Sequence, residues 1–198
     1  MFQPAPGVHI PFPEKVPEQF QVYENQCIRA TGSFEKLRPL ITEIYQSFQA
    51  PLFLVLQVPL PLQEERQFGQ ENKLHQAVYY LDGQTQSQIA SILDVYGEVL
   101  LADGISQFAI ASHANHEEVF VQRYKITDLY SSSPRRFVPL LQKYGLTETE
   151  HLFTAWDTFS PETPGRCRRV TIDEMDIFAI VQQLEKQGLY RAKTIEEP

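Results

Sequence analysis

The sequence predicts an α+β fold, in which a mixed, mainly antiparallel sheet carries about four packed helices. Segments with apolar residues at helical spacing alternate with short apolar or alternating runs that are typical of strands. A helix–strand–strand order occurs three times, with helices beginning near residues 33, 87 and 133, and a partial fourth unit begins near residue 173. The 198 residues are 42% hydrophobic, so a chain of this length can bury a core without a disulfide or a metal.

Residues 1–18 are expected to form an extended, proline-rich arm, and residues 19–198 a single α+β domain. The arm contains five prolines, each of which fixes φ and removes a backbone donor, so a helix is excluded there. Phe2, Val8 and Ile10 provide apolar side chains with which the arm can pack against the rest of the protein. Both a packed arm and a disordered tail are therefore left open.

The first unit begins at Ser33, a suitable N-cap for a helix that extends to about residue 48. Pro39 predicts a kink or a late start in this helix. Residues 52–58 are apolar and bounded by prolines, which predicts a buried strand. Residues 76–81 form the next predicted strand, which ends at a turn.

In the second unit, Thr85 or Ser87 caps a helix that ends at Asp103–Gly104. Two strands follow, over residues 105–112 and 119–126. The second of them alternates polar and apolar residues, and the turn between the two contains His116.

The third helix begins at Ser133–Pro134 and ends at Gly145. Residues 147–150 match a capping box, whereas residues 152–159 are rich in strand formers, so we expect a helical turn followed by a strand. A strand over 167–172, a helix over 173–187 and an edge strand over 189–195 complete the prediction.

Charge and motifs exclude several functions. The net charge is −8, and 15 acidic and 8 basic side chains before residue 131 account for −7 of it. An acidic chain without a basic stripe is a poor binder of nucleic acid. No apolar run is long enough to span a membrane and no secretory signal is recognisable, so we expect a cytoplasmic protein. The familiar glycine-rich phosphate loops are absent, and no cofactor is predicted.

Two patterns could support an enzyme. His113 and His116 lie beside two glutamates, but at a hairpin tip the two side chains would splay, and no third ligand is identifiable, so we predict no metal site. Cys167 lies between two arginines, which would favour its thiolate. The simpler interpretation is that Cys27 and Cys167 are reduced, partly buried thiols.

Two segments suggest a binding surface instead. The long polar connection over residues 59–73 contains Glu64, Glu65 and the aromatic Phe68. The single tryptophan, Trp156, is followed by Asp157, and a hairpin would place both opposite Arg166 and Arg168. These seven residues are the predicted partner-binding set.

We therefore predict a non-enzymatic protein that binds another protein, with acidic charge steering a basic partner. The profile is similar to that of small acidic bacterial binding proteins, immunity proteins included, so an immunity-type inhibitor is one form of this hypothesis. Two alternatives stay open. One is an enzyme that uses His113 and His116, or Cys167, in an unrecognised site. The other is a sensor domain that binds a small molecule in an apolar cavity.

Overall fold

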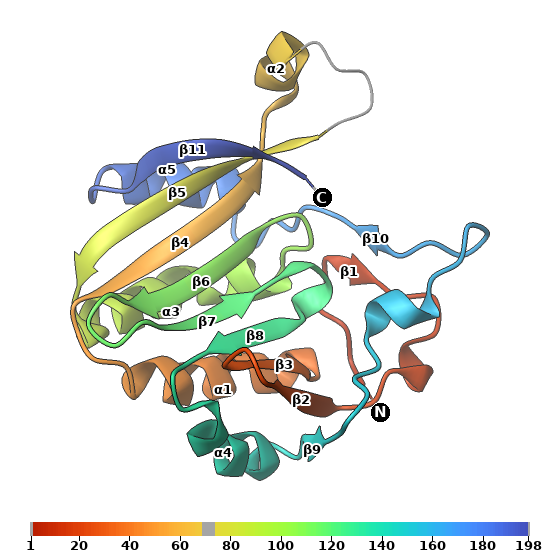
Figure 1. Ribbon diagram of the computed structural model, residues 1–198. Coiled ribbons are helices and arrows are strands. Elements are labelled where there is room, and N and C mark those ends of the chain that lie inside the picture. Colours follow the sequence, from red (N-terminus) through yellow and green to blue (C-terminus); the bar gives the residue numbers. More distant parts are fainter. Residues whose placement is uncertain (1, 69–73, 198) are drawn as a thin grey trace.

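The computed structural model describes residues 2–68 and 74–197, and one nine-stranded sheet organises it (Figure 1). Every pair of neighbouring strands is antiparallel except β2 and β9, which are parallel. The α+β prediction with a mainly antiparallel mixed sheet is confirmed. From edge to edge the strands are β11 (Tyr190–Glu196), β5 (His75–Gln84), β4 (Leu52–Pro59), β6 (Gln107–Ser112), β7 (Glu117–Val121), β8 (Thr127–Tyr130), β3 (Cys27–Thr31), β2 (Gln19–Tyr23) and β9 (Thr147–Glu148).

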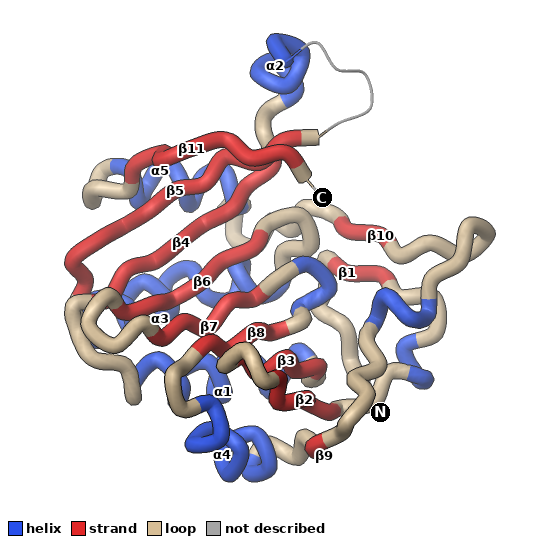
Figure 2. The backbone as a smooth tube through the Cα atoms, in the orientation of Figure 1, coloured by secondary structure: helices blue, strands red, loops and turns tan. Residues whose placement is uncertain are grey.

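The larger helices lie on one face of this sheet (Figure 2). They are α1 (Phe34–Gln46), α3 (Gln86–Ala102) and α5 (Ile177–Glu185), and their apolar stripes meet the sheet in the main hydrophobic core. The short helices are α2 (Leu62–Glu65) and α4 (Val138–Lys143), and single 3-10 turns are η1 (Pro13–Lys15), η2 (Arg66–Phe68), η3 (Arg123–Lys125), η4 (Pro134–Phe137) and η5 (Ala155–Thr158). Among the described residues, no helix combines the length and the apolar character needed to cross a membrane.

The structure contains the elements that the strongest sequence signals predict. The apolar run after Pro51 is β4, and its partner β5 extends the predicted 76–81 strand at both ends. Thr85 caps α3 through a capping box with Gln88. Ser33 stands at the N-cap of α1, but its Oγ accepts a hydrogen bond from the backbone N–H of Gln3 and does not cap the helix.

The helix–strand–strand order holds for α1 with β4 and β5, and for α3 with β6 and β7. After α4 the chain again forms two strands, but both are only two residues long. β9 pairs with β2, while β10 (Arg166–Cys167) pairs with β1 (Val8–His9) in a separate two-stranded sheet. The predicted hairpin that would place Trp156 opposite Arg166 is therefore wrong.

Several predicted boundaries are also wrong. The strand over 119–126 ends at Val121, because the chain turns through η3 and returns as β8. Residues 152–159 contain η5 and no strand, and the capping box is formed by Thr154 and Asp157 rather than within 147–150. The final helix begins late, at Ile177 after the N-cap Asp176, because residues 173 and 174 have positive φ.

Two segments carry more structure than the sequence suggests. Residues 19–31, for which no element is predicted, form the β2–β3 hairpin. The N-terminal arm packs on the body: Phe2, Val8 and Ile10 are buried in a small cluster that also contains Tyr124 and Ala155. Of the two possibilities for this arm, the described residues take the packed one.

Two glycines hold the arm against the end of α3. Gly7 donates to the backbone carbonyl of Ala102 (2.7 Å), and its own carbonyl accepts from Arg168 N (2.8 Å). Gly104 donates to Arg168 O (3.0 Å). A Cβ atom at either glycine would overlap with backbone atoms of the other. Glycine is therefore required where the arm, α3 and the 166–168 segment meet.

We expect Gly104→Ala to lower the free energy of unfolding by about 1–3 kcal/mol, because the added methyl group must push the arm away. Gly97→Ala is the matched control: its Cβ would meet only Leu93, at 3.5 Å. Since alanine is favoured over glycine inside a helix by up to about 1 kcal/mol, this variant should be as stable as the wild type or more so. Urea denaturation of both variants measures the difference, and equal stability of the two would contradict the close approach.

Candidate functional site

Segments that are far apart in the sequence meet at one corner of the large sheet. β4 ends there at Pro59 and β5 begins there at His75, because antiparallel neighbours reverse their direction. The start of β6 and the turn η3 reach the same corner, and so does the chain after β11, at Glu197 (Figure 1).

A cavity of about 350 Å³ opens at this corner, which places it at the lower end of the range for ligand sites. Apolar and ionisable side chains share its walls. The lining residues are Pro59, Leu60, Leu62, Glu65, Leu74, His75, Ile105, Arg123, Cys167 and Glu197.

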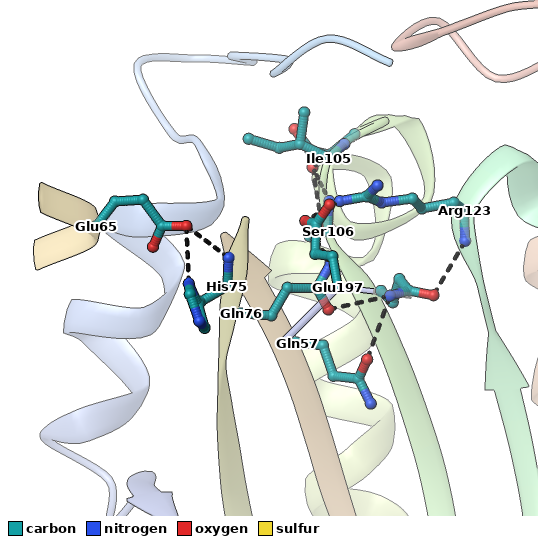
Figure 3. Close-up of polar contacts among 10 residues, drawn as sticks. Gln57, Glu65, His75, Gln76, Ile105, Ser106, Arg123 and Glu197 are labelled. Carbon is teal, nitrogen blue, oxygen red and sulfur yellow. Dashed lines mark hydrogen bonds and ion pairs between the residues drawn. The ribbon is translucent and has the colours of Figure 1, made fainter. Parts of the chain in front are cut away.

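A network of three glutamine side chains lies next to the cavity (Figure 3). Gln107 lies between Gln57 and Gln76, and its Nε2 donates to the Oε1 atom of each at 3.2 Å. Gln107 Oε1 accepts from the backbone N–H of Arg123 (3.3 Å). This network ties β4, β5 and β6 to the turn η3, so it fixes the direction from which Arg123 enters the site.

The Arg123 side chain holds Glu197, the residue that follows β11, in place. Its Nη2 donates to Glu197 Oε1, which also accepts from Gln76 Nε2 (3.1 Å). Arg123 Nε is shielded from solvent and has no hydrogen-bond partner among the described residues. The guanidinium charge is thus matched by one carboxylate, while part of its donor capacity is unused.

On the opposite wall, Glu65 and His75 form a pair (Figure 3). Glu65 Oε1 accepts from the backbone N–H of His75 at 2.6 Å and lies 3.0 Å from its Nδ1. Since an ionised carboxylate can only accept, Nδ1 carries the proton in this contact. Glu65 Oε2 is buried and has no hydrogen-bond partner in the part of the chain that the structure describes.

The turn η3 is strained, because Tyr124 and Lys125 both have positive φ (55° and 58°) although neither is glycine. Such a conformation is sparsely populated and persists only where surrounding contacts hold it. Here Tyr124 packs edge-on against Trp156 and Phe159, with ring centroids 4.7 and 4.9 Å apart. The turn therefore directs Arg123 toward the cavity and Tyr124 toward the aromatic cluster.

Cys167 lines the cavity, but its surroundings do not activate it. Burial raises the pKa of the Cys167 thiol, and the hydrogen bond with Tyr124 and the charges of Arg123 and Lys125 only partly oppose this effect. A neutral thiol is a weak nucleophile. Cys27 is also a free thiol, and burial together with the nearby Asp128 raises its pKa to about 11. The prediction of two unpaired cysteines is confirmed.

Lys125 is a fully buried lysine at the other side of the same turn. Its Nζ donates to Leu100 O at the end of α3 (3.2 Å), where the helix dipole favours a cation. Burial lowers the pKa of Lys125 to about 8, although Asp103 and Cys167 act in the opposite direction. Lys125 thus caps α3 and does not reach the cavity lining.

Two of the three residues predicted in the 59–73 connection have partners within the chain. Glu64 accepts from Arg191 (2.6 Å) on the edge strand β11, and Glu65 holds His75. Phe68 closes η2, and its side chain lies outside the described structure, as do residues 69–73. Of this set, the described structure places Glu65 in the cavity wall.

The residues predicted around Trp156 lie in a neighbouring cluster. Trp156 is 53% exposed, while Asp157 accepts from the backbone N–H of Thr154 (2.7 Å) and so caps η5. Arg166 is exposed on β10, and Arg168 donates to Pro6 O (3.1 and 3.2 Å). Tyr124, which contacts both Trp156 and Cys167, links this cluster to the cavity.

His113 and His116 lie at the far end of β6 from the cavity, in the turn before β7. His113 stacks on Phe53, with ring centroids 4.2 Å apart, and His116 is exposed. No group of three or more metal-binding side chains gathers anywhere in the described ranges. The histidine that does line the cavity is His75, which sequence reasoning did not single out.

Sequence reasoning also missed Leu62, Leu74, Arg123 and Glu197. The two leucines stand at the two ends of an otherwise polar connection, which was a usable signal. Arg123 was assigned to a strand, and no local pattern indicates that the turn η3 directs it into a cavity. Glu197 follows the predicted edge strand, and no pattern connects it with Arg123.

No family model, curated protein or solved structure matches this chain. The function must therefore be argued from the site itself.

We expect both thiols of the native protein to react slowly with iodoacetamide near neutral pH, because their raised pKa values leave little thiolate. Denaturation should expose two reactive thiols. The variants Cys27→Ser and Cys167→Ser show which alkylation rate of the native protein belongs to which cysteine. A native Cys167 that reacts faster than free cysteine would restore the nucleophile hypothesis.

The lowered pKa of Lys125 predicts that the stability of the protein depends on pH in a characteristic way. This pKa is about 8 in the folded protein, against about 10.4 for unfolded lysine. Between these values the unfolded chain binds more protons at this position, so stability rises with pH. The wild type should therefore gain stability relative to Lys125→Met between about pH 8 and about pH 10, by at most ~1.4 kcal/mol per pH unit. Urea denaturation across this range measures the gain, and a constant difference would contradict the lowered pKa.

Proposed function

We propose that this protein is a non-enzymatic binding protein that docks another protein at the cavity and its leucine rim. The leucine rim consists of Leu62 and Leu74, the two leucines at the ends of the polar connection. The proposal keeps the partner-binding interpretation of the sequence and moves its centre from the charged residues to the cavity.

The observation that carries the proposal is the exposure of the leucine rim. Leu62 is 72% exposed and Leu74 is 62% exposed, and both side chains line the cavity. Single exposed apolar residues are common, whereas two large ones that line the same cavity form an apolar patch, and exposed apolar patches mark interaction sites. A small ligand held inside the cavity would leave much of both leucines in water, whereas a protein surface would cover them.

The charges agree with a partner that is basic overall. The net charge of −8 favours encounter with a positive surface and acts mainly on the association rate. Glu64 and Asp157 are engaged within the chain, so neither provides a dedicated contact. Steering then comes from the field of the whole molecule rather than from those two side chains.

Trp156 offers a second exposed apolar side chain. It is half exposed and is held by Tyr124 and Phe159, so little side-chain entropy is lost when a partner covers it. Tyr124 touches both this ring and Cys167 of the cavity wall. This chain of contacts supports Trp156 as a second contact of the same partner.

The alternative enzyme hypothesis has weaker support. The cavity brings His75, Glu65 and Cys167 together, which are the residue types of a thiol nucleophile with an oriented base. However, the thiol is hydrogen-bonded with Tyr124, and burial raises its pKa. Binding without covalent chemistry explains why two leucines are exposed beside the cavity. Catalysis by a thiol nucleophile does not require exposed leucines.

The test is capture of partners from extracts of the source cells on immobilised protein. A Leu62→Asp/Leu74→Asp variant should lose the specific partner, and Trp156→Ala should release it faster. Val95→Asp is the matched control, because Val95 is 69% exposed on α3 and lies outside the cavity lining.

A protein retained by the wild type and by Val95→Asp, but lost by the leucine variant, is the expected result. Equal capture by all variants would contradict the proposed surface. Recovery of a small molecule from the cavity in native mass spectrometry, with no protein dependent on the leucines, would favour the sensor alternative.

A further inference from the structure

The charges on the cavity walls are unequal. The cavity is lined by two carboxylates, Glu65 and Glu197, and by one guanidinium, Arg123. Arg123 is paired with Glu197, whose Oε1 also accepts from Gln76. The carboxylate with unused acceptor capacity is therefore Glu65, whose Oε1 accepts from His75 and whose Oε2 is buried and has no hydrogen-bond partner among the described residues.

The burial of Glu65 Oε2 without a donor costs folding free energy. A buried acceptor without a donor loses its hydration and gains nothing in return, and the penalty is larger for a charged group. A donor that enters the cavity would remove this penalty, and a cationic donor would add charge attraction. The neighbouring Glu64 differs in this respect, because Arg191 already neutralises it at 2.6 Å.

We propose that the cavity receives a lysine side chain of the protein partner, with its ammonium group on Glu65 and its aliphatic stem against the leucine rim. This inference rests on the proposed function and specifies the group that enters the site. A lysine combines an apolar four-carbon stem with a point charge at its tip. The cavity provides walls of both kinds, the apolar Leu60, Leu62 and Leu74 and the carboxylate of Glu65.

Lysine fits this site better than arginine does. A guanidinium binds a carboxylate best through two parallel hydrogen bonds, which need both carboxylate oxygens. Glu65 Oε1 already accepts two contacts from His75, so a single oxygen remains. One ammonium donor on one oxygen satisfies Oε2 without displacing His75.

Two small probes test the inference on the full-length protein. They are Nα-acetyl-lysine N-methylamide and Nα-acetyl-norleucine N-methylamide, which share the same four-carbon stem and differ by the ammonium group. The dissociation constants are obtained from amide chemical shifts, with the His75 resonance as the reporter. We expect the lysine probe to bind about tenfold more tightly than the norleucine probe.

Glu65→Gln should abolish this preference, so that the two probes bind equally tightly, and detectable binding of the norleucine probe shows that the cavity is intact. Glu64→Gln is the matched control and should keep the full preference, because Glu64 pairs with Arg191 and does not line the cavity. An arginine probe should bind no more tightly than the lysine probe.

The outcomes separate the two proposals. Equal binding of the lysine and norleucine probes to the wild type overturns the lysine inference but leaves the apolar docking surface in place. A preference that survives in Glu65→Gln also overturns it. Binding of neither probe counts against the cavity as a docking site, and therefore against both proposals.

Discussion

The strained turn η3 is the constraint on which the site depends. Its three residues serve three different parts of the molecule. Arg123 pairs with Glu197, which follows β11, Tyr124 supports Trp156, and Lys125 caps the end of α3. Two consecutive positive φ angles outside glycine are unfavourable, so the turn is maintained by these contacts and by the glutamine network beneath it. A loss of any one of the contacts would allow the turn to relax and would move the others.

Sheet topology explains why the site lies at this corner. Antiparallel pairing brings the end of β4, the start of β5 and the start of β6 together, although Pro59, His75 and Gln107 are well separated in the sequence. The connection between β4 and β5 must therefore begin and end beside the cavity. Its two terminal leucines become the rim for that reason, whatever the polar residues between them do.

The sequence predicted the elements whose signals are local and strong. A run such as residues 52–58, with apolar residues bounded by prolines, is informative by itself, and the capping box at Thr85 marks a helix start. Two-residue strands carry no such signal. β9 and β10 exist because β2 and the N-terminal arm lie alongside them, so their pairing depends on tertiary contacts.

The site was predictable only in part, for a related reason. Sequence reasoning could select the 59–73 connection and Glu65, because a long polar connection is a local feature. It could not tell which charges find partners inside the chain. Glu64 meets Arg191 more than a hundred positions away, and Asp157 caps its own turn. Charged residues that looked available in the sequence are therefore engaged, while His75 and Arg123 become important through the fold.

The face of the sheet opposite the helices is an alternative surface, and its packing explains why we propose the cavity as the binding site. Tyr190, Tyr80, Phe53 and His113 form a row of stacked rings across that face, with adjacent centroids between 4.2 and 6.3 Å apart. Phe53 and Tyr80 of this row, together with Phe120 and Ile195, pack against the buried Val55, Val78 and Ala109. Phe53 and Tyr80, at the centre of the row, are already partly buried within the chain, so a partner would add less burial there. The two leucines of the rim are 72% and 62% exposed, so the free energy from burying them would be gained if a partner bound there.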